Sequence, residues 1–97
     1  MSTTTVVQYA TKPEAADENA RLIRAVFDEL AEKRPAGLRY AAYRLADGVS
    51  FVHVVQVDGD DNPLPGLAAF AEFQKGIGER VVAAPVFTSG TALGAYA

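Results

Sequence analysis

The chain has 97 residues, of which 49% are hydrophobic and 22% charged, with 8 Gly and 5 Pro. This length suits one domain, residues 1–97, and this composition excludes disordered and collagen-like chains. Twelve acidic and nine basic residues give a net charge of −3, which offers no attraction for a phosphate backbone, so we expect no nucleic-acid partner. Without Cys and with one His, thiolate and multi-histidine sites are excluded, and we expect no bound metal.

The N-terminal sequence shows no basic segment followed by an apolar one, so it does not resemble a secretion signal. No apolar run approaches the ~18 residues that a membrane-spanning helix needs. We therefore expect a cytoplasmic protein that does not interact with a membrane.

The first two elements are predicted to be a strand over 5–10 and a helix over 13–33. β-Branched residues and an aromatic residue fill the first segment, as is typical of strands. Thr11 and Glu14 have the spacing of a capping box, which predicts that the Thr11 hydroxyl caps the helix. Large apolar residues then recur at helical spacing and form one stripe that needs a core: Leu22, Ile23, Val26, Phe27 and Leu30.

Two strand-like segments, 38–45 and 50–57, flank Asp47-Gly48, a pair that favours a two-residue type I′ hairpin turn. If Ala46 lies opposite Val49, then Ala42 lies opposite His53. One face then carries Leu38, Tyr40, Ala42, Arg44, Phe51, His53, Val55 and Val57, and the other carries Arg39, Ala41, Tyr43, Leu45, Ser50, Val52, Val54 and Gln56. Neither face is polar, so we expect both faces of this sheet to be covered.

A second helix is predicted from about 66 to 79, with a core line of Leu67, Phe70, Ala71, Phe73 and Ile77. Gly76 and Gly78 lower helix stability by ~1 kcal/mol each relative to Ala, so the helix should fray or end there. The segment 85–96 is rich in Val, Thr and aromatic residues and is predicted to be a last strand. Its length exceeds the usual ~5 to 6 residues of a strand.

The order strand, helix, hairpin, helix, strand predicts a ferredoxin-like α+β fold, with a four-stranded antiparallel sheet and two helices on one face. Two helices cover one face, which leaves the second apolar face open to water. Monomers rarely expose such a patch. We therefore predict a homodimer in which two sheets meet through their open faces, with the long C-terminal strand reaching across to the partner.

Over its whole length the chain resembles the dimeric α/β-barrel superfamily, and within it the small proteins similar to antibiotic biosynthesis monooxygenases. The segments that carry the resemblance are 37–44 (GLRYAAYR), 51–57 (FVHVVQV) and 67–73 (LAAFAEF). The resemblance implies a face-to-face dimer with a pocket between sheet and helices. In some members it also implies oxidation of polycyclic aromatic substrates without metal or flavin, so no cofactor is expected. Related haem-degrading members use a helix His and a strand Trp; here the second helix has no His and Val57 takes the strand position, which argues against haem cleavage.

Three residues are candidates for chemistry. His53 could move a proton, while Tyr40 and Arg44 could place the oxygen of an enolate-like intermediate. The expected ligand, a small aromatic or lipophilic metabolite, would lie against Phe51, Val55, Phe70 and Phe73. Two functions remain open: a cofactor-independent monooxygenase or isomerase, and a non-catalytic dimeric module in which His53 and Tyr40 only pack. A continuous cavity beside His53 would favour the first, and a filled core the second.

Overall fold

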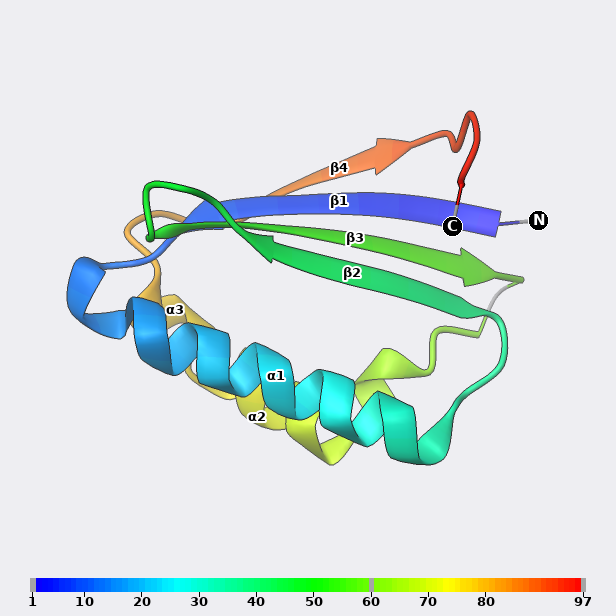
Figure 1. Ribbon diagram of the computed structural model, residues 1–97, viewed down its shortest axis with the longest axis horizontal. Helices are drawn as coiled ribbons and strands as arrows, with labels where there is room; N and C mark the ends of the chain where they lie inside the picture. Colours follow the sequence, from blue (N-terminus) through cyan, green and yellow to red (C-terminus); the bar gives the residue numbers. More distant parts are fainter. Residues whose placement is uncertain (1, 60, 97) are drawn as a thin grey trace.

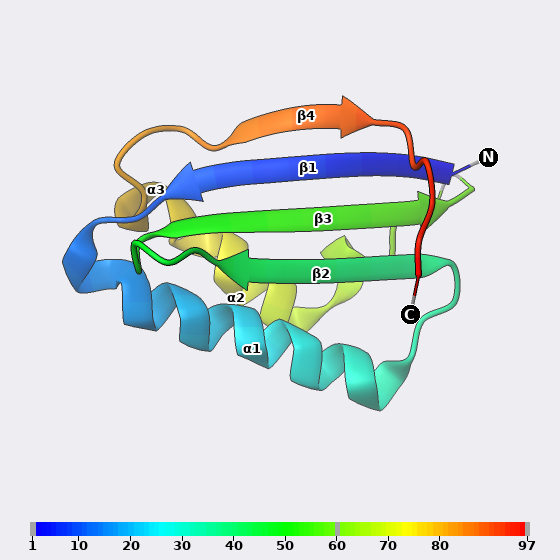
Figure 2. The ribbon, with the colours of Figure 1, turned by 45° about the horizontal axis from the view of Figure 1, so that its top comes forward.

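The computed structural model describes residues 2–59 and 61–96. The chain forms β1 (Ser2–Ala10), α1 (Ala16–Lys33), β2 (Leu38–Arg44), β3 (Ser50–Asp58), α2 (Ala68–Lys75), α3 (Ile77–Arg80) and β4 (Val86–Gly90), with 3₁₀ turns at Pro13–Ala15 and Leu64–Gly66. All strand pairs are antiparallel, in the order β2-β3-β1-β4, and the helices lie together on one side of the sheet (Figures 1 and 2). The predicted ferredoxin-like α+β fold is confirmed.

The strand register of the hairpin is confirmed, whereas its turn differs from the prediction. Ala42 lies opposite His53, and Arg44 lies opposite Phe51. A type I′ turn needs positive φ at both central residues, and in this loop Gly48 has φ 79° while Asp47 does not have a positive φ. The loop instead has four residues, 46–49, because the Leu45 N–H donates to the Ser50 carbonyl. The longer loop leaves the strand register as predicted, because Leu45 still lies opposite Ser50.

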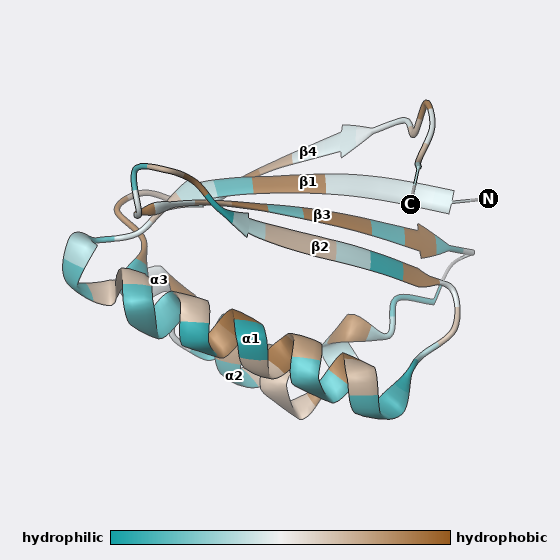
Figure 3. Ribbon diagram, viewed as in Figure 1, coloured by the Kyte–Doolittle hydropathy of each residue, from teal (hydrophilic) through white to brown (hydrophobic). Residues whose placement is uncertain are grey.

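Helix α1 begins later and by a different means than predicted. A 3₁₀ turn precedes it, and no side chain caps either helical start. Thr11 is buried, its hydroxyl donates to the Val49 carbonyl over 3.4 Å, and its backbone bridges to Val81. The predicted capping box is therefore wrong, since Thr11 continues the strand pairing beyond the end of β1 instead of capping the helix. Figure 3 shows hydrophobic and hydrophilic residues alternating along α1, and the predicted apolar stripe packs in the core.

The second helical segment is interrupted where the glycines predicted it. Gly76 ends α2 with a non-helical backbone, and α3 begins at the next residue. Leu67 and Phe73 of the predicted core line are buried, but Ala71 is exposed and Ala69 packs against the core in its place. The N-terminus of α2 is held by α1: the N–H groups of residues 68 and 69 donate to the carboxylate of Glu29 over 3.3 and 2.8 Å.

The last strand is shorter than predicted. β4 covers five residues, Val86–Gly90, all exposed, and pairs with β1 alone. Within the described residues 91–96 no regular structure follows, and the side chains of Leu93 and Tyr96 are fully exposed. This segment runs on the side of the sheet that faces away from the helices (Figures 1 and 2). A strand needs a hydrogen-bonded neighbour, and this segment has none in the single chain.

The strand pairing divides the sheet into two faces. The covered face is turned toward the helices and carries Thr3, Thr5, Val7, Tyr9, Leu38, Tyr40, Ala42, Arg44, Phe51, His53, Val55, Val57, Phe87 and Ser89. The open face is turned away from them and carries Ser2, Thr4, Val6, Gln8, Ala10, Arg39, Ala41, Tyr43, Ser50, Val52, Val54, Gln56, Asp58, Val86, Thr88 and Gly90. The covered face is largely apolar. The open face has an apolar centre, Val6, Ala41, Tyr43, Val52 and Val54, with polar residues around it, and no helix of the described residues covers it.

Candidate functional site

A cavity lies between the covered face and the second helical segment. Its volume is about 410 Å³, which is within the usual range of small-molecule sites. Its wall is formed by Thr3, Thr5, Val7, Tyr9, Tyr40, His53, Val55, Val57, Gly59, Asn62, Leu64, Phe70, Phe73, Gln74, Ile77, Pro85 and Phe87. Most of these side chains are apolar, and the polar groups of Tyr9, Tyr40 and His53 come from adjoining strands. The cavity therefore combines an apolar wall with a localised set of hydrogen-bonding groups.

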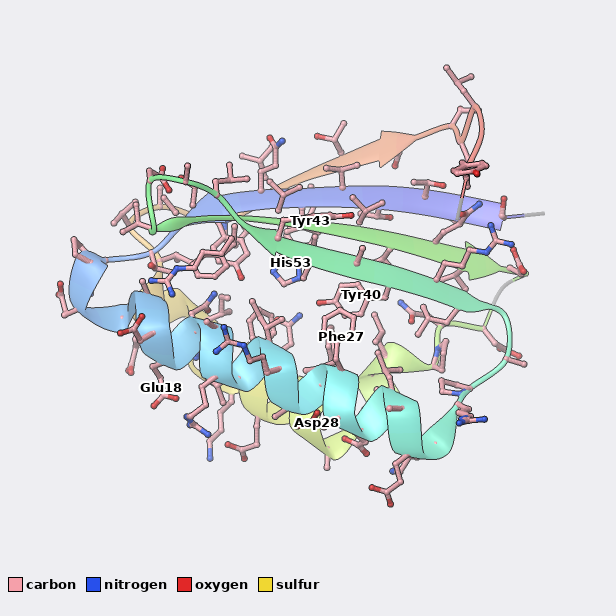
Figure 4. All side chains as sticks on the ribbon, viewed as in Figure 1. Glu18, Phe27, Asp28, Tyr40, Tyr43 and His53 are labelled. Carbon is pink, nitrogen blue, oxygen red and sulfur yellow. The ribbon has the colours of Figure 1, made fainter. Side chains whose placement is uncertain are left out.

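Five of the seven residues that the sequence singles out lie in this wall: His53, Tyr40, Val55, Phe70 and Phe73. His53 and Tyr40 point from the sheet into the layer between sheet and helices, where Phe27 of α1 lies against Tyr40 (Figure 4). The alternation of strand residues accounts for this, because His53, Val55 and Tyr40 share one face of the hairpin.

The other two, Arg44 and Phe51, lie outside the cavity wall. The guanidinium of Arg44 pairs with Asp17 over 3.1 Å and donates to the Gly48 carbonyl over 2.8 Å, at the hairpin end of the sheet. Phe51 is 2% exposed and stacks on Tyr9, with 5.6 Å between ring centroids. Both share the predicted face, but they lie two residues closer to the hairpin loop than Ala42 and His53. There they line a separate, smaller cavity of about 170 Å³.

Both ring nitrogens of His53 are engaged by tyrosines. Its Nε2 lies 2.8 Å from the Tyr9 hydroxyl, and its Nδ1 lies 2.6 Å from the Tyr40 hydroxyl. The ring is 3% exposed and lies 5.6 Å from that of Phe73. A proton that reached His53 from a ligand in the cavity would therefore have to pass through a tyrosine hydroxyl.

Two further buried polar residues, Asn19 and Arg80, extend this hydrogen-bonded group. The Asn19 amide nitrogen donates to the Tyr9 hydroxyl over 2.9 Å, and Arg80 Nε donates to the Asn19 amide oxygen over 2.9 Å. Arg80 Nη2 also donates to the Phe73 carbonyl over 2.6 Å. A Cβ at Gly76 would lie 3.0 Å from Arg80 Nη1, so the missing side chain at that position leaves room for the guanidinium.

Sequence reasoning did not assign Tyr9, Asn19 or Arg80 to the site. One of them left a signal: Asn19 precedes Ile23 by four residues and Val26 by seven, so it is a polar residue on the buried stripe of α1. Buried amides need hydrogen-bond partners, and such a position predicts a polar contact inside the core. Arg80 left none, since its burial depends on the helix break at Gly76.

Burial keeps the central groups of the site neutral at pH 7. It lowers the pKa of His53 from 6.5 to about 4 and raises the pKa of Tyr9 from 10.0 to about 12. Burial also raises the pKa of Tyr40. The pKa of Arg80 is lowered by burial as well, but a guanidinium stays protonated in proteins. Arg80 is thus the one charged group of the hydrogen-bonded set.

Among the described residues, no group of three or more His, Asp or Glu side chains is placed to hold a metal ion. Within the same residues, no helix combines the length and the apolar character needed to cross a bilayer.

No protein-family model matches the sequence, and no curated protein matches it significantly. Solved structures do match over nearly the whole chain. Rv0793 from Mycobacterium tuberculosis superposes with a TM-score of 0.76 at 18% identity, with 100% of both chains covered. A protein of Nitrosomonas europaea provisionally named an antibiotic biosynthesis monooxygenase gives 0.77 at 13% identity, covering 95% of this chain and 90% of its own. The chain has the antibiotic biosynthesis monooxygenase fold.

SnoaB, a cofactor-independent oxygenase from Streptomyces nogalater, shares this antibiotic biosynthesis monooxygenase fold. Its TM-score is 0.69 at 16% identity, with 97% of this chain and 95% of that one covered. The predicted resemblance is therefore confirmed at the level of the fold. At these identities the superpositions establish architecture, and the chemistry of this chain has to be argued from its own cavity.

Proposed function

We propose that the cavity binds a small aromatic or lipophilic metabolite. The observation that supports this most is the cavity itself, about 410 Å³ and continuous with His53 and Tyr40. A filled core would instead favour a purely structural module. Phe70 and Phe73 supply aromatic surface on the helix side of the wall, and their rings lie 6.3 Å apart. Rings of this kind stack on planar ligands, and the tyrosine hydroxyls can orient a polar atom of the ligand.

We further propose that two chains pair through their open faces. The open face exposes Tyr43 by 57% and Val86 by 59%, and the segment after β4 exposes Leu93 and Tyr96 fully. The charged residues of that face, Arg39 and Asp58, lie toward one end of the strands, so the centre of the face would offer a second copy apolar surface. Burial of such a surface drives association, and the segment 91–96 could gain a strand partner from the second chain.

The catalytic candidate is the oxygenation of the bound ligand without a cofactor. An aromatic ketone whose carbonyl is conjugated through the rings with a CH₂ group, as in anthrone, would bind with its oxygen at Tyr40, whose hydroxyl stabilises the enolate form by a hydrogen bond. Dioxygen would then oxidise the enolate carbon: the CH₂ becomes C=O, one oxygen atom enters the product, and the second leaves as water with the two hydrogens. His53 would support Tyr40 and exchange a proton through it. This chemistry is allied to that named for SnoaB.

A non-catalytic binding module is the second candidate, and one observation favours it. Both nitrogens of His53 are already hydrogen-bonded to tyrosines, as in a histidine that organises a core, and burial weakens its basicity. The two candidates differ in what they require of His53 beyond packing.

Ligand binding is tested with 9-fluorenone and fluorene, two flat molecules of nearly equal shape of which the first carries an oxygen. Titration calorimetry on the wild type should show binding that Phe73→Ala weakens, while Tyr43→Ala on the open face leaves ligand affinity unchanged. Native mass spectrometry reports subunit number and any retained molecule together. No binding of either probe and no retained molecule would contradict the proposed site.

Oxygenation is tested with anthrone under ¹⁸O₂, by oxygen consumption and the mass of the product. We expect anthraquinone that contains one ¹⁸O atom, and a strongly reduced rate for His53→Ala and Tyr40→Phe. Probe binding without turnover would favour the binding module, and turnover that survives His53→Ala would remove His53 from the reaction.

A further inference from the structure

A row of five hydrogen-bonded side chains crosses the interior from α3 to the edge strand β2. In order, it consists of Arg80, Asn19, Tyr9, His53 and Tyr40, joined by contacts of 2.9, 2.9, 2.8 and 2.6 Å. Three of its four links are buried and the one to Tyr40 is partly buried, and Arg80 itself is 8% exposed. In a continuous row of this kind, the direction in which one group donates constrains the direction of the next.

Arg80 fixes the direction at one end, because a guanidinium donates hydrogen bonds and accepts none. Its Nε–H must therefore meet the Asn19 oxygen, which turns the Asn19 amide nitrogen toward Tyr9 as a donor. The Tyr9 oxygen accepts that bond, and its own hydrogen is free to go to His53 Nε2. A neutral imidazole carries one proton, which then lies on Nδ1 and is donated to the Tyr40 oxygen.

The opposite direction leaves a hydrogen without a partner. If His53 carried its proton on Nε2, Tyr9 would accept from both His53 and Asn19, and among the described residues no acceptor would face the Tyr9 hydroxyl hydrogen. An unpartnered buried donor is strongly unfavourable. In the preferred direction the last free hydrogen belongs instead to Tyr40. Both tyrosines line the cavity, but Tyr9 is buried and Tyr40 is only half-buried, so the free hydrogen of Tyr40 can meet a ligand.

We propose that Arg80 and Asn19 are positioning residues that hold His53 in its Nδ1–H tautomer and thereby present the Tyr40 hydroxyl to the cavity as a hydrogen-bond donor. The tautomer does not depend on the proposed function. The consequence for ligand choice does rest on the proposed function. If the cavity binds a ligand, its polar end should select a molecule that carries an acceptor oxygen, such as a ketone, over a molecule of equal shape that lacks the oxygen.

The single histidine makes the tautomer directly measurable. In protein labelled with ¹⁵N-histidine, long-range ¹H–¹⁵N correlation spectra at pH 7 contain the ring signals of His53 alone. We expect a protonated Nδ1 and an unprotonated Nε2 in the wild type. A protonated Nε2, an even mixture of tautomers or a charged imidazolium would overturn the proposal.

Asn19→Asp is the decisive variant because it reverses the row without changing the shape of residue 19. The carboxylate accepts from Arg80 and also from the Tyr9 hydroxyl, so Tyr9 can no longer donate to His53. His53 should then donate from Nε2 to Tyr9 and accept from Tyr40 at Nδ1. Persistence of the Nδ1–H tautomer in a folded Asn19→Asp protein would overturn the proposal.

Asn62→Asp is the matched control. Asn62 lies in the cavity wall but outside the row, and its side-chain oxygen accepts from the Leu64 N–H, which a carboxylate can also do. This variant adds the same charge near the cavity and should leave the His53 tautomer unchanged. A second control is Arg80→Lys, since an ammonium also only donates and should preserve the wild-type tautomer. A switch of tautomer in both controls would contradict the assigned roles.

The preference for a ligand with an acceptor oxygen is measured as the ratio of the affinities for 9-fluorenone and fluorene. One hydrogen bond corresponds to roughly a fivefold to tenfold preference for fluorenone, which Asn19→Asp should abolish while Asn62→Asp retains it. If the tautomer behaves as expected but neither probe binds, the proposed function fails while the positioning role stands. Equal affinity of the wild type for the two probes would remove the selection of acceptor oxygens.

Discussion

The two faces of the sheet are built from the same four strands and both have an apolar centre, yet they are organised differently. The covered face encloses a cavity and a row of hydrogen-bonded polar groups centred on His53. The open face presents aliphatic side chains and Tyr43 to its surroundings. An apolar face that also buries a few polar groups, oriented by one another, can select a ligand. An apolar face without such groups can still bind a second chain. The difference lies in what is buried beside the apolar residues.

The largest difference between the faces should appear on removing a large ring. Phe51→Ala on the covered face removes a ring that is 2% exposed and should lower the free energy of unfolding by about 4 kcal/mol. Tyr43→Ala on the open face, where the ring is 57% exposed, should cost less than about 1 kcal/mol in the monomer. Urea unfolding at low protein concentration measures both. Equal losses would show that the open face is as well packed as the covered one.

A charge on the open face tests association. Val54→Glu places a carboxylate at the centre of the proposed interface and should weaken dimerisation by about 3 kcal/mol, or roughly a hundredfold. Gln56→Glu is the control, because it adds the same charge opposite Arg39 on the neighbouring strand. Sedimentation equilibrium reports the change. A wild type that is monomeric at micromolar concentration would contradict the dimer itself.

Acid should destabilise the protein through His53 on the covered face. Its pKa is 6.5 in the unfolded chain and about 4 when folded, so the unfolded state binds the proton first as the pH falls. Stability is complete above pH 6.5, declines toward pH 4 and is lost no further below it. Between pH 7 and pH 4.5 the wild type should lose about 2.5 kcal/mol through this residue.

The matched variant for this pH effect is His53→Gln, which does not titrate. The pKa of Asp47 is lowered by its hydrogen bonds with Ser50 and Val49, and that of Glu29 by Lys33 and the Ala69 N–H. These carboxylates lose their stabilising effect on acidification in both proteins, so the difference between the urea curves isolates His53. Identical pH dependence in the two proteins would show that His53 is not buried as a neutral ring.

The smallest expected change in stability concerns the loop between β2 and β3, which sets the strand register and thereby the face on which each side chain lies. Gly48 has φ 79°, and nothing lies within 4 Å of a Cβ built there, so Gly48→Ala should cost about 1 kcal/mol from backbone conformation alone. Gly78→Ala, in α3 with equally open surroundings, should instead stabilise by up to ~1 kcal/mol. Thermal unfolding compares the two. A stabilising Gly48→Ala would mean that the loop does not constrain the register.

Much of the fold follows from local pattern. Strand alternation and one tight hairpin place His53, Tyr40 and Val55 together on one face without knowledge of the rest of the chain. The capping box was wrong because the Thr11 backbone bridges to Val81, seventy residues away, and the Thr11 hydroxyl bonds the Val49 carbonyl. The last strand was predicted too long because composition indicates strand propensity, whereas strand formation needs a neighbour, and β1 offers one only opposite Val86–Gly90.

The site was predicted less completely than the fold. His53 and Tyr40 were found because residue type and strand register suffice for them. Arg44 was proposed for the same reason, but its long side chain reaches Asp17 at the start of α1 instead of the cavity. Asn19 and Arg80 come from separate helices, and their contact depends on how these helices pack. Such pairings have no short-range sequence pattern.

The helix break at Gly76 links two positions that have no obvious relation in the sequence. A side chain at 76 would press on the Arg80 guanidinium. Homologues with a larger residue at 76 should therefore have replaced the arginine at 80, and a large residue at 76 together with arginine at 80 should be rare. In a library that randomises both codons, survivors should fall into two groups: glycine with arginine, and larger residues with shorter or uncharged ones. The bend in that helix thus determines which substitutions its neighbours tolerate.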